Sequence, residues 1–264
     1  MNRSARTHAV VSIVGLALLY LPLLAVAAMS FNRSRFGVTW QGFTFDWYQR
    51  LWQNDIVLHA ARNTFALAIA STVISTILGT MLALGMSRYR WPRRAQSALT
   101  TLIHLPIVTP DIIFAAAMVV AFRFLRSLSD LFELGLTTMI IAHVTFQISF
   151  VALVVRARLA TIEPEIEEAA RDLYASTFDV VRKVLLPLIA PGIVAGALLA
   201  FTLSLDDFVI SFFTSGPDSV TLPIYIFSSL KRGLSPEIHA ISTLVFLATT
   251  FLAVALQLFS ARTR

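Results

Sequence analysis

The sequence predicts an all-α protein: a polytopic transmembrane helical bundle of about six spans that forms a single domain over residues 1–264. Hydrophobic residues make up 57% of the chain and charged residues only 14%, with a mean hydropathy of +0.76. A soluble domain would carry roughly a quarter charged residues. The apolar residues also gather in runs long enough to cross a hydrocarbon core of about 30 Å. These observations indicate an integral membrane protein.

The first apolar run extends from Ala9 to Phe31 and follows Arg3 and Arg6. Residues 25–27 (Ala-Val-Ala) resemble a signal-peptidase site, which leaves a cleaved signal open. The run is longer than a typical signal core, however, and favours an uncleaved first span.

The next segment, residues 32–62, is rich in aromatic side chains: Trp40, Phe43, Phe45, Trp47, Tyr48 and Trp52. Such residues are typical of a short amphipathic element at the outer membrane interface. A contact surface for an extracytoplasmic partner is the alternative.

Five further runs complete the predicted bundle: Asn63–Met86, Ser97–Phe122, Thr137–Val155, Leu186–Leu205 and His239–Phe259. The second of these is interrupted by His104, Pro106, Pro110 and, in its middle, Asp111. Prolines kink a helix and free backbone carbonyls, which is tolerated at membrane depth only beside protein or water. We therefore expect this span to face partners or a pore.

The distribution of Lys and Arg predicts the orientation. The larger share of these residues, including the cluster Arg88, Arg90, Arg93 and Arg94, lies on the side that holds both termini and residues 156–187. Loops rich in Lys and Arg stay in the cytoplasm. Both termini and the polar segment 156–187 are therefore expected to be cytoplasmic. The net charge of +6 is explained by topology, and we expect no nucleic acid partner.

The polar segment 156–187 has the pattern of a docking element. Pro164 suits the first position of a helix, and the glutamates that follow suit the positive end of its dipole. Helical spacing gives this helix a narrow apolar stripe: Ile166, Ala169, Ala170 and Leu173. Because the helix is acidic, we expect it to meet a basic protein groove rather than an anionic membrane. A hairpin that only covers the membrane surface is the alternative.

A second helix is predicted directly after the first. Ser176 and Asp179 have the spacing of a capping box. The helix that they open would continue through Pro187 into the fifth span. A push on the first helix would then move the fifth span directly.

Several motifs in the chain carry a family resemblance: Glu168-Ala169-Ala170, Leu186-Pro187, SFNRSRFG at 30–37, WQGFT at 40–44, PDI at 110–112 and FTLSLDD at 201–207. They resemble the EAA-loop permease subunits of ABC importers, in particular those of spermidine/putrescine importers, over nearly the whole chain. The resemblance implies the type I importer permease (MetI-like) fold and a place in the bacterial inner membrane.

The same resemblance implies partners and coupling residues. The partners would be a second permease subunit, a homodimeric ATPase that binds ATP and Mg²⁺, and an extracytoplasmic polyamine-binding protein. The residues implied to couple to the ATPase are Glu165, Glu168, Ala169, Ala170, Asp172, Leu173, Tyr174 and Ala175.

Tyr174 departs from the family pattern, which has a glycine at this place. Glycine permits a left-handed turn at a helix end, whereas a tyrosine at positive φ would be strained. Either the turn uses another conformation, or Tyr174 makes its own contact with the ATPase.

Four polar residues form the predicted substrate pathway: Asp111, Ser204, Asp206 and Asp207. A polyamine needs separated carboxylates, and aromatic faces hold ammonium groups weakly enough for release. Neighbouring residues on a helix point about 100° apart, so at most one of Asp206 and Asp207 is expected to line a path. The alternatives are helix termination for these two and, for Asp111, a buried hydrogen bond or a partner contact. His104 and His143 are expected to pack at helix contacts.

The sequence also bears on other classes of function. The chain has no cysteine and no phosphate loop, nucleophile elbow or zinc-protease motif, so we expect no catalytic residue, metal site or bound cofactor. A self-contained channel or secondary transporter is an alternative, but it would favour inverted repeats, and the sequence has no convincing internal symmetry. A permease for another small organic solute is the nearer alternative.

Overall fold

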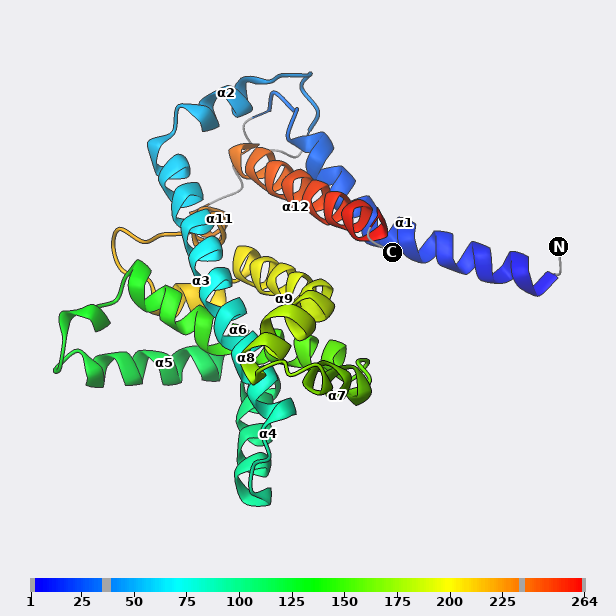
Figure 1. The fold of residues 1–264 in the computed structure, drawn as a ribbon. Helices are drawn as coiled ribbons and strands as arrows, with labels where there is room; N and C mark the ends of the chain where they lie inside the picture. Colours follow the sequence, from blue (N-terminus) through cyan, green and yellow to red (C-terminus); the bar gives the residue numbers. More distant parts are fainter. Residues whose placement is uncertain (1–2, 35–38, 233–235, 263–264) are drawn as a thin grey trace. The chain divides into compact units, whose positions relative to one another are not determined.

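The computed structural model describes residues 3–34, 39–232 and 236–262. Figure 1 shows the helices in chain order. Among the described residues, the single pairing of extended backbone is an isolated bridge between Asn32 and Phe43. The chain divides into two compact units, Met1–His59 with Tyr225–Arg264, and Ala60–Ile224.

The helical elements follow one another along the chain, with the longest connection, residues 30–45, between α1 and α2. They are α1 (Arg3–Met29), α2 (Asp46–Trp52), α3 (Asp55–Arg88), α4 (Arg93–Val108), α5 (Asp111–Leu125), the 3-10 turn η1 (Asp130–Phe132), α6 (Leu136–Leu159), α7 (Pro164–Asp172), α8 (Thr177–Asp179), the π-helix η2 (Val180–Leu185), α9 (Leu186–Asp206), α10 (Val209–Thr214), α11 (Leu222–Arg232) and α12 (Pro236–Arg262).

In the first unit, a buried asparagine organises the aromatic segment. Asn32 is 1% exposed; its side-chain N–H donates to the Thr39 carbonyl at 2.9 Å, and its side-chain oxygen accepts the N–H of Gln41 at 2.9 Å. The Trp47 indole donates to the Asn32 carbonyl at 2.8 Å. The short element predicted in this segment is therefore present as α2, and α2 contacts α12. Residues 35–38 of the segment lie outside the described residues.

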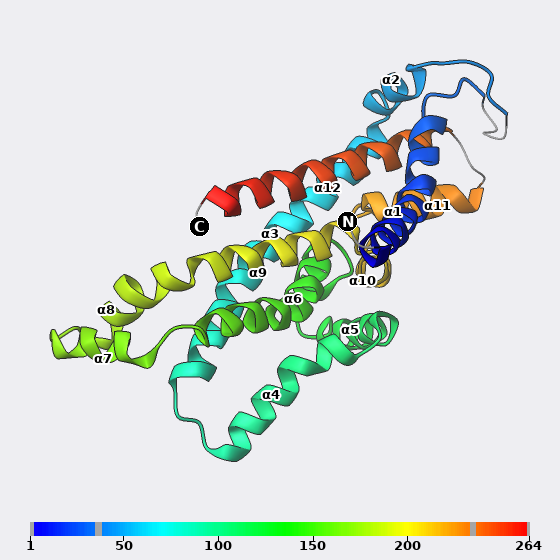
Figure 2. The ribbon, with the colours of Figure 1, turned by 90° about the vertical axis from the view of Figure 1, so that its right-hand side faces the viewer.

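The second unit is built on the close packing of α6 against its neighbours. Helices α6 and α9 lie side by side (Figures 1 and 2) and form the most extensive helix pair. Val151 of α6 packs against Gly79 of α3 and Gly196 of α9, and Arg158 packs over Gly192. A Cβ atom on Gly79 would lie 2.7 Å from the Val151 Cβ atom, and one on Gly192 would lie 2.6 Å from the Arg158 Cβ atom. Small residues of this kind let membrane helices approach closely.

The predicted Ser97–Phe122 span is wrong as a single helix. The chain breaks after Val108 into α4 and α5, which are bent by 111°. Thr109 is extended, as expected for a residue before proline, with ψ of 129°. Pro110 lacks the N–H that would continue the helix. Asp111 consequently lies in the first turn of α5 rather than in the middle of a span.

Four helices among the described residues are long and apolar enough to cross a membrane, and the bent α4–α5 pair would add a fifth. The four are α1, α3, α6 and the continuous helix from Thr177 to Asp206. The sixth predicted run, His239–Phe259, lies in α12, where the apolar stretch Glu237–Phe251 is shorter. The side chains beyond Phe251 lie outside the described part of the chain.

Candidate functional site

Helix α7 forms the centre of the predicted docking element. Pro164 occupies its first turn together with Glu165 and Glu167, where free backbone N–H groups favour negative charge. Most of the predicted coupling residues are exposed on α7 or on the turn after it: Glu165, Glu168, Ala169, Asp172, Leu173 and Tyr174. Ala170 and Ala175 instead pack against the core cluster that includes residues of α3, α6 and α9. One face of the segment therefore packs against the core cluster, and the other face is exposed on the surface of the chain.

The outward face carries large apolar side chains. Leu173, Tyr174 and Phe178 are 83%, 98% and 69% exposed. Exposed apolar residues that cluster beside charged ones mark a surface that another protein covers. The carboxylates of Glu165, Glu168 and Asp172 on α7 are exposed as well, which favours a partner with a basic groove.

The turn after α7 is a Schellman motif with tyrosine at the usual glycine position. The Tyr174 N–H donates to the Arg171 carbonyl at 2.9 Å, and the Ala175 N–H donates to the Ala170 carbonyl at 3.1 Å, which is the paired pattern of this motif. Tyr174 has a φ of 59° and is the single non-glycine residue with positive φ in the described residues. The chain therefore keeps the left-handed turn, at a cost of about 1–2 kcal/mol for a side chain in this region.

Replacing Tyr174 by glycine is expected to preserve or improve stimulation of the ATPase in the assembled complex. The substitution removes the strain of the left-handed turn, although the added freedom of the unfolded chain offsets about 0.4–1 kcal/mol of the gain. Tyr174→Ala is the matched control, because it removes the ring and keeps the strain. Stimulated ATP hydrolysis would be measured for both variants. A severe loss in both would mean that the ring itself makes the coupling contact.

An ion pair that the sequence analysis missed holds α7 against the end of α3. Arg88 Nε lies 2.6 Å from Glu167 Oε1, and Glu167 is 8% exposed. In the sequence, Arg88 is one member of a basic cluster and Glu167 is one of several helix-start glutamates. No local pattern pairs them, because the fold brings together two distant parts of the chain.

The docking element leads into α9 without a break, as predicted. Residues 177–206 form one helix, of which 180–185 are a π-helix. Ser176 Oγ accepts the N–H of Asp179 at 3.2 Å, which confirms the predicted cap, and it donates to Asp179 Oδ2 at 2.6 Å. The π-helix ends just before Pro187, which cannot donate a helical hydrogen bond. Such widened turns are frequent at functional sites.

The second candidate site is a pocket of about 360 Å³ lined by residues of α4, α5, α6, α9 and α10. Its lining combines carboxylates with aromatic rings: Asp111, Asp206, Asp207, Phe114, Phe146, Phe150 and Phe208. Carboxylates attract cations, and ring faces add cation–π attraction. The pocket is thus chemically suited to a flexible organic cation.

The three carboxylates have different surroundings. Asp207 caps α10: its Oδ1 accepts the N–H of Ile210 at 3.2 Å, and its Oδ2 accepts the N–H of Ser211 at 2.7 Å. Asp206, at the end of α9, and Asp111, at the start of α5, are exposed. The oxygens of Asp207 are therefore engaged by the backbone, while Asp111 and Asp206 line the pocket and have exposed side chains.

Ser204 and the two histidines are placed differently from the aspartates. Ser204 is 2% exposed and lies outside the pocket lining, within 2.8 Å of His143 Nδ1. His143 is fully buried between helices, as predicted. The prediction for His104 is wrong, because its side chain is exposed and pairs with the Thr100 carbonyl of its own helix at 2.7 Å.

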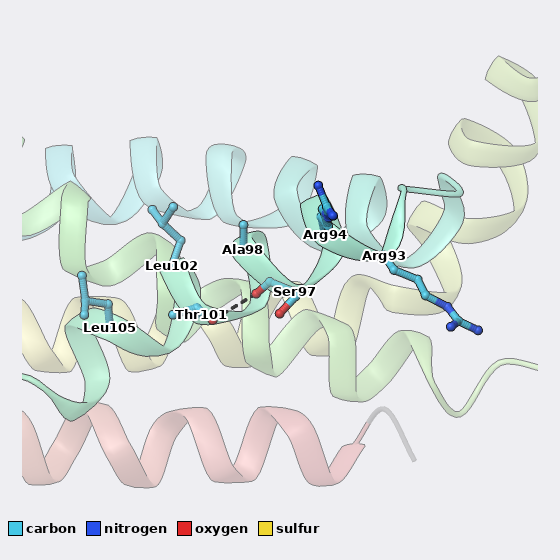
Figure 3. Close-up of a pocket in the computed structure, with 7 residues that line it drawn as sticks. All are labelled: Arg93, Arg94, Ser97, Ala98, Thr101, Leu102 and Leu105. Carbon is cyan, nitrogen blue, oxygen red and sulfur yellow. Dashed lines mark hydrogen bonds between the residues drawn. The ribbon is translucent and has the colours of Figure 1, made fainter.

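A larger hollow, of about 740 Å³, lies along α4 (Figure 3). It is lined by Arg93, Arg94, Ser97, Ala98, Thr101, Leu102 and Leu105. Figure 3 shows the two arginines near one end of the row and the leucines near the other. Its only charges are positive, so this hollow is a poor site for a cation and shares no residue with the predicted pathway.

The chain is similar to known membrane transport proteins. Residues 75–263 match the family described as "Binding-protein-dependent transport system inner membrane component". The chain is 38% identical over 242 residues to the spermidine/putrescine transport system permease protein PotC of Escherichia coli, covering 92% of this chain and 89% of PotC. It is 38% identical over 238 residues to the putrescine transport system permease protein PotI of Escherichia coli, covering 89% of this chain and 84% of PotI.

Among solved structures, the chain resembles one chain of a bacterial ABC transporter involved in the import of the acidic polysaccharide alginate. The TM-score is 0.76 at 19% sequence identity, with 99% of this chain and 95% of that chain covered. This likeness confirms the predicted all-α fold of type I importer permeases.

Proposed function

Because the chain belongs to the family of binding-protein-dependent transport system inner membrane components, we propose that it is a permease subunit that forms half of the translocation pathway of a polyamine-importing ABC transporter. One observation carries the substrate class: the pocket that gathers Asp111, Asp206 and Asp207 with four phenylalanine rings. A polyamine is a flexible polycation, and this combination offers its ammonium groups charge and ring faces together. The named polyamine permeases PotC and PotI support the same class.

The permease works with other subunits in this proposal. A second, similar permease completes the pathway, a homodimeric ATPase binds ATP and Mg²⁺ and docks on α7, and an extracytoplasmic polyamine-binding protein delivers the substrate. The exposed acidic and apolar face of α7 supports the ATPase contact. The chain itself has no phosphate loop, so it is a non-catalytic subunit and the hydrolysis belongs to the partner.

The proposed location is the bacterial inner membrane, with both termini and α7 in the cytoplasm. The basic cluster between α3 and α4 supports this orientation, because such clusters stay on the cytoplasmic side. With α7 in the cytoplasm, movement of the ATPase is transmitted through the turn at Tyr174 into the continuous helix 177–206. That helix ends at Asp206, on the substrate pocket.

Replacing Asp206 by asparagine in the reconstituted importer is expected to raise the KM for spermidine uptake about tenfold, and replacing Asp111 as well to raise it further. A charged hydrogen bond contributes about 1.5–3 kcal/mol, and 1.4 kcal/mol corresponds to a factor of ten. Uptake into vesicles would be measured with the cognate binding protein present.

Asp130→Asn is the matched control, since Asp130 is an exposed carboxylate outside the pocket lining. It is expected to leave the KM unchanged. If the double variant Asp111→Asn/Asp206→Asn imported spermidine like the unmodified complex, the pocket would not be the substrate path. Import of a different organic solute, with no polyamine uptake, would favour the alternative permease function.

A further inference from the structure

We infer that His143 is a positioning residue of the transport pathway: it holds Asp207 in place and links movement of α9 to α10 at the substrate pocket. The inference rests on the proposed function for its role in transport. Its structural basis is a buried set of polar side chains in the second unit, contributed by α3, α6, α9 and α10. None of these residues except Asp207 lines the pocket.

His143 lies at the junction of three elements. Its Nδ1 is 2.8 Å from Ser204 Oγ of α9, and its Nε2 is 3.1 Å from Ser211 Oγ of α10. The same Nε2 lies 3.3 Å from Asp207 Oδ2. His143, Ser204 and Ser211 are 0%, 2% and 0% exposed, so water does not substitute for these contacts. One imidazole ring of α6 therefore touches the last turn of α9 and the first turn of α10 at once.

The hydrogen bonds can all point the same way. A carboxylate only accepts, so the His143 Nε2–H donates towards Asp207, and Nδ1 of the neutral ring accepts the hydroxyl proton of Ser204. Ser71 Oγ lies 3.3 Å from Ser204 Oγ and can donate to it. Gln147 donates to Ser71 Oγ at 3.3 Å and to the Ala200 carbonyl at 3.2 Å. The donors of His143, Ser204, Ser71 and Gln147 thus each have an acceptor, which stabilises the set at membrane depth.

The end of this set of side chains that lies farthest from Asp207 is bound to α3. Ser75 Oγ donates to Gln147 Oε1 at 3.0 Å. Helix α6 also packs closely on α3 through Gly79 and Val151. His143 is therefore held by the closely packed pair α3 and α6, while its three partners, Ser204, Asp207 and Ser211, lie on α9 and on the segment after it.

This arrangement makes His143 sensitive to a shift of α9. Ser204 lies in the last turn of the helix that begins at Thr177, within the docking element. A hydrogen bond weakens beyond a separation of about 3.5 Å, so displacement of α9 by less than about 1 Å breaks the 2.8 Å contact of Ser204 with His143. The ring is then free to strengthen its bonds to Asp207, which caps α10, and to Ser211 of α10. A movement that begins at α7 thereby reaches the wall of the pocket.

The test uses the assembled complex with cysteine-free partner subunits, since this chain has no cysteine of its own. An Asp206→Cys reporter is treated with a positively charged thiol reagent with and without ATP. With His143 present, we expect ATP to change the modification rate about fivefold or more. With His143→Ala, we expect no change.

A second set of variants carries no reporter. In this set, His143→Ala is expected to raise the KM for polyamine uptake about tenfold. His143→Gln, which keeps a donor for Asp207, is expected to recover the KM to within about threefold.

Controls separate positioning from simple loss of packing. Thr145→Ala, on the exposed side of the same helix, is expected to leave both readouts unchanged. Ser204→Ala keeps the ring and should lose the ATP-dependent change while leaving the KM near its original value, which covers the case in which His143→Ala fails to assemble. An ATP-dependent change that persists in His143→Ala or Ser204→Ala would overturn the inference. Absence of polyamine uptake by the unmodified complex would overturn the proposed substrate instead, and the reporter would still decide the role of His143.

Discussion

Replacing Gly216 by alanine is expected to lower the stability of the second unit by about 3 kcal/mol, the upper end for overpacking a core. A Cβ atom at this position would collide with the carbonyl oxygen of Leu134 and lie 2.9 Å from its carbonyl carbon. Both are backbone atoms, so no side-chain rotation can make room. The turn is also fixed, because the Gly216 N–H donates to Ser219 Oγ at 2.7 Å. For a domain of this size the loss corresponds to a fall in Tm of about 6–12 °C.

Thermal unfolding of the purified complex would measure this effect, with Gly85→Ala as the matched control. Gly85 lies inside α3 and a Cβ atom there would meet nothing within 4 Å. Alanine in a helix interior is favoured over glycine by about 0.5–1 kcal/mol, so the control should stabilise slightly. Equal Tm values for Gly216→Ala and the unmodified protein would show that the connection before α6 moves aside without cost.

The elements that local chemistry defines could be predicted from the sequence. The start of α7 at Pro164, the cap at Ser176 and the uninterrupted helix into α9 each depend on a few neighbouring residues, and all three are present. The sequence alone does not decide whether the turn at Tyr174 is left-handed. It shows the cost of a tyrosine at positive φ, but not the packing of Ala170 and Ala175 that holds the turn.

The pathway residues show where local reasoning ends. Helical spacing predicts that at most one of Asp206 and Asp207 lines a path, but both line the pocket, because α9 ends at Asp206 and Asp207 caps α10. Ser204 has the right polarity for a pathway residue, yet the fold turns it inwards to His143. The prolines near Asp111 predict a kink, while the bend of 111° depends on where α5 packs against α10. Each miss concerns a contact between residues distant in sequence.

Replacing Arg88 by leucine is expected to reduce ATP-driven uptake about tenfold while ATP hydrolysis continues. The change leaves the buried Glu167 carboxylate without its cation, and an unsatisfied buried group costs about 1–3 kcal/mol. Because the Arg88 side chain is 31% exposed and that of Glu167 only 10%, the cost falls on the glutamate. Helix α7 would then separate from the end of α3, and part of a push from the ATPase would tilt α7 away from α3 instead of passing through the turn at Tyr174 into α9. Faster amide hydrogen exchange in residues 164–172 would report this separation.

Two further variants serve as controls for the Arg88–Glu167 pair. Arg126→Leu breaks a pair with Glu133 of similar length, 2.8 Å, whose side chains are 57% and 59% exposed; exposed pairs contribute about 0–1 kcal/mol, so little change is expected. The double variant Arg88→Leu/Glu167→Leu removes both charges, and replacing both partners by apolar groups is often nearly neutral. It should therefore recover much of the uptake lost in Arg88→Leu. If the double variant transported no better than Arg88→Leu, the arginine would act through a contact other than Glu167, and the anchor of α7 would have to be sought among its packing against the core.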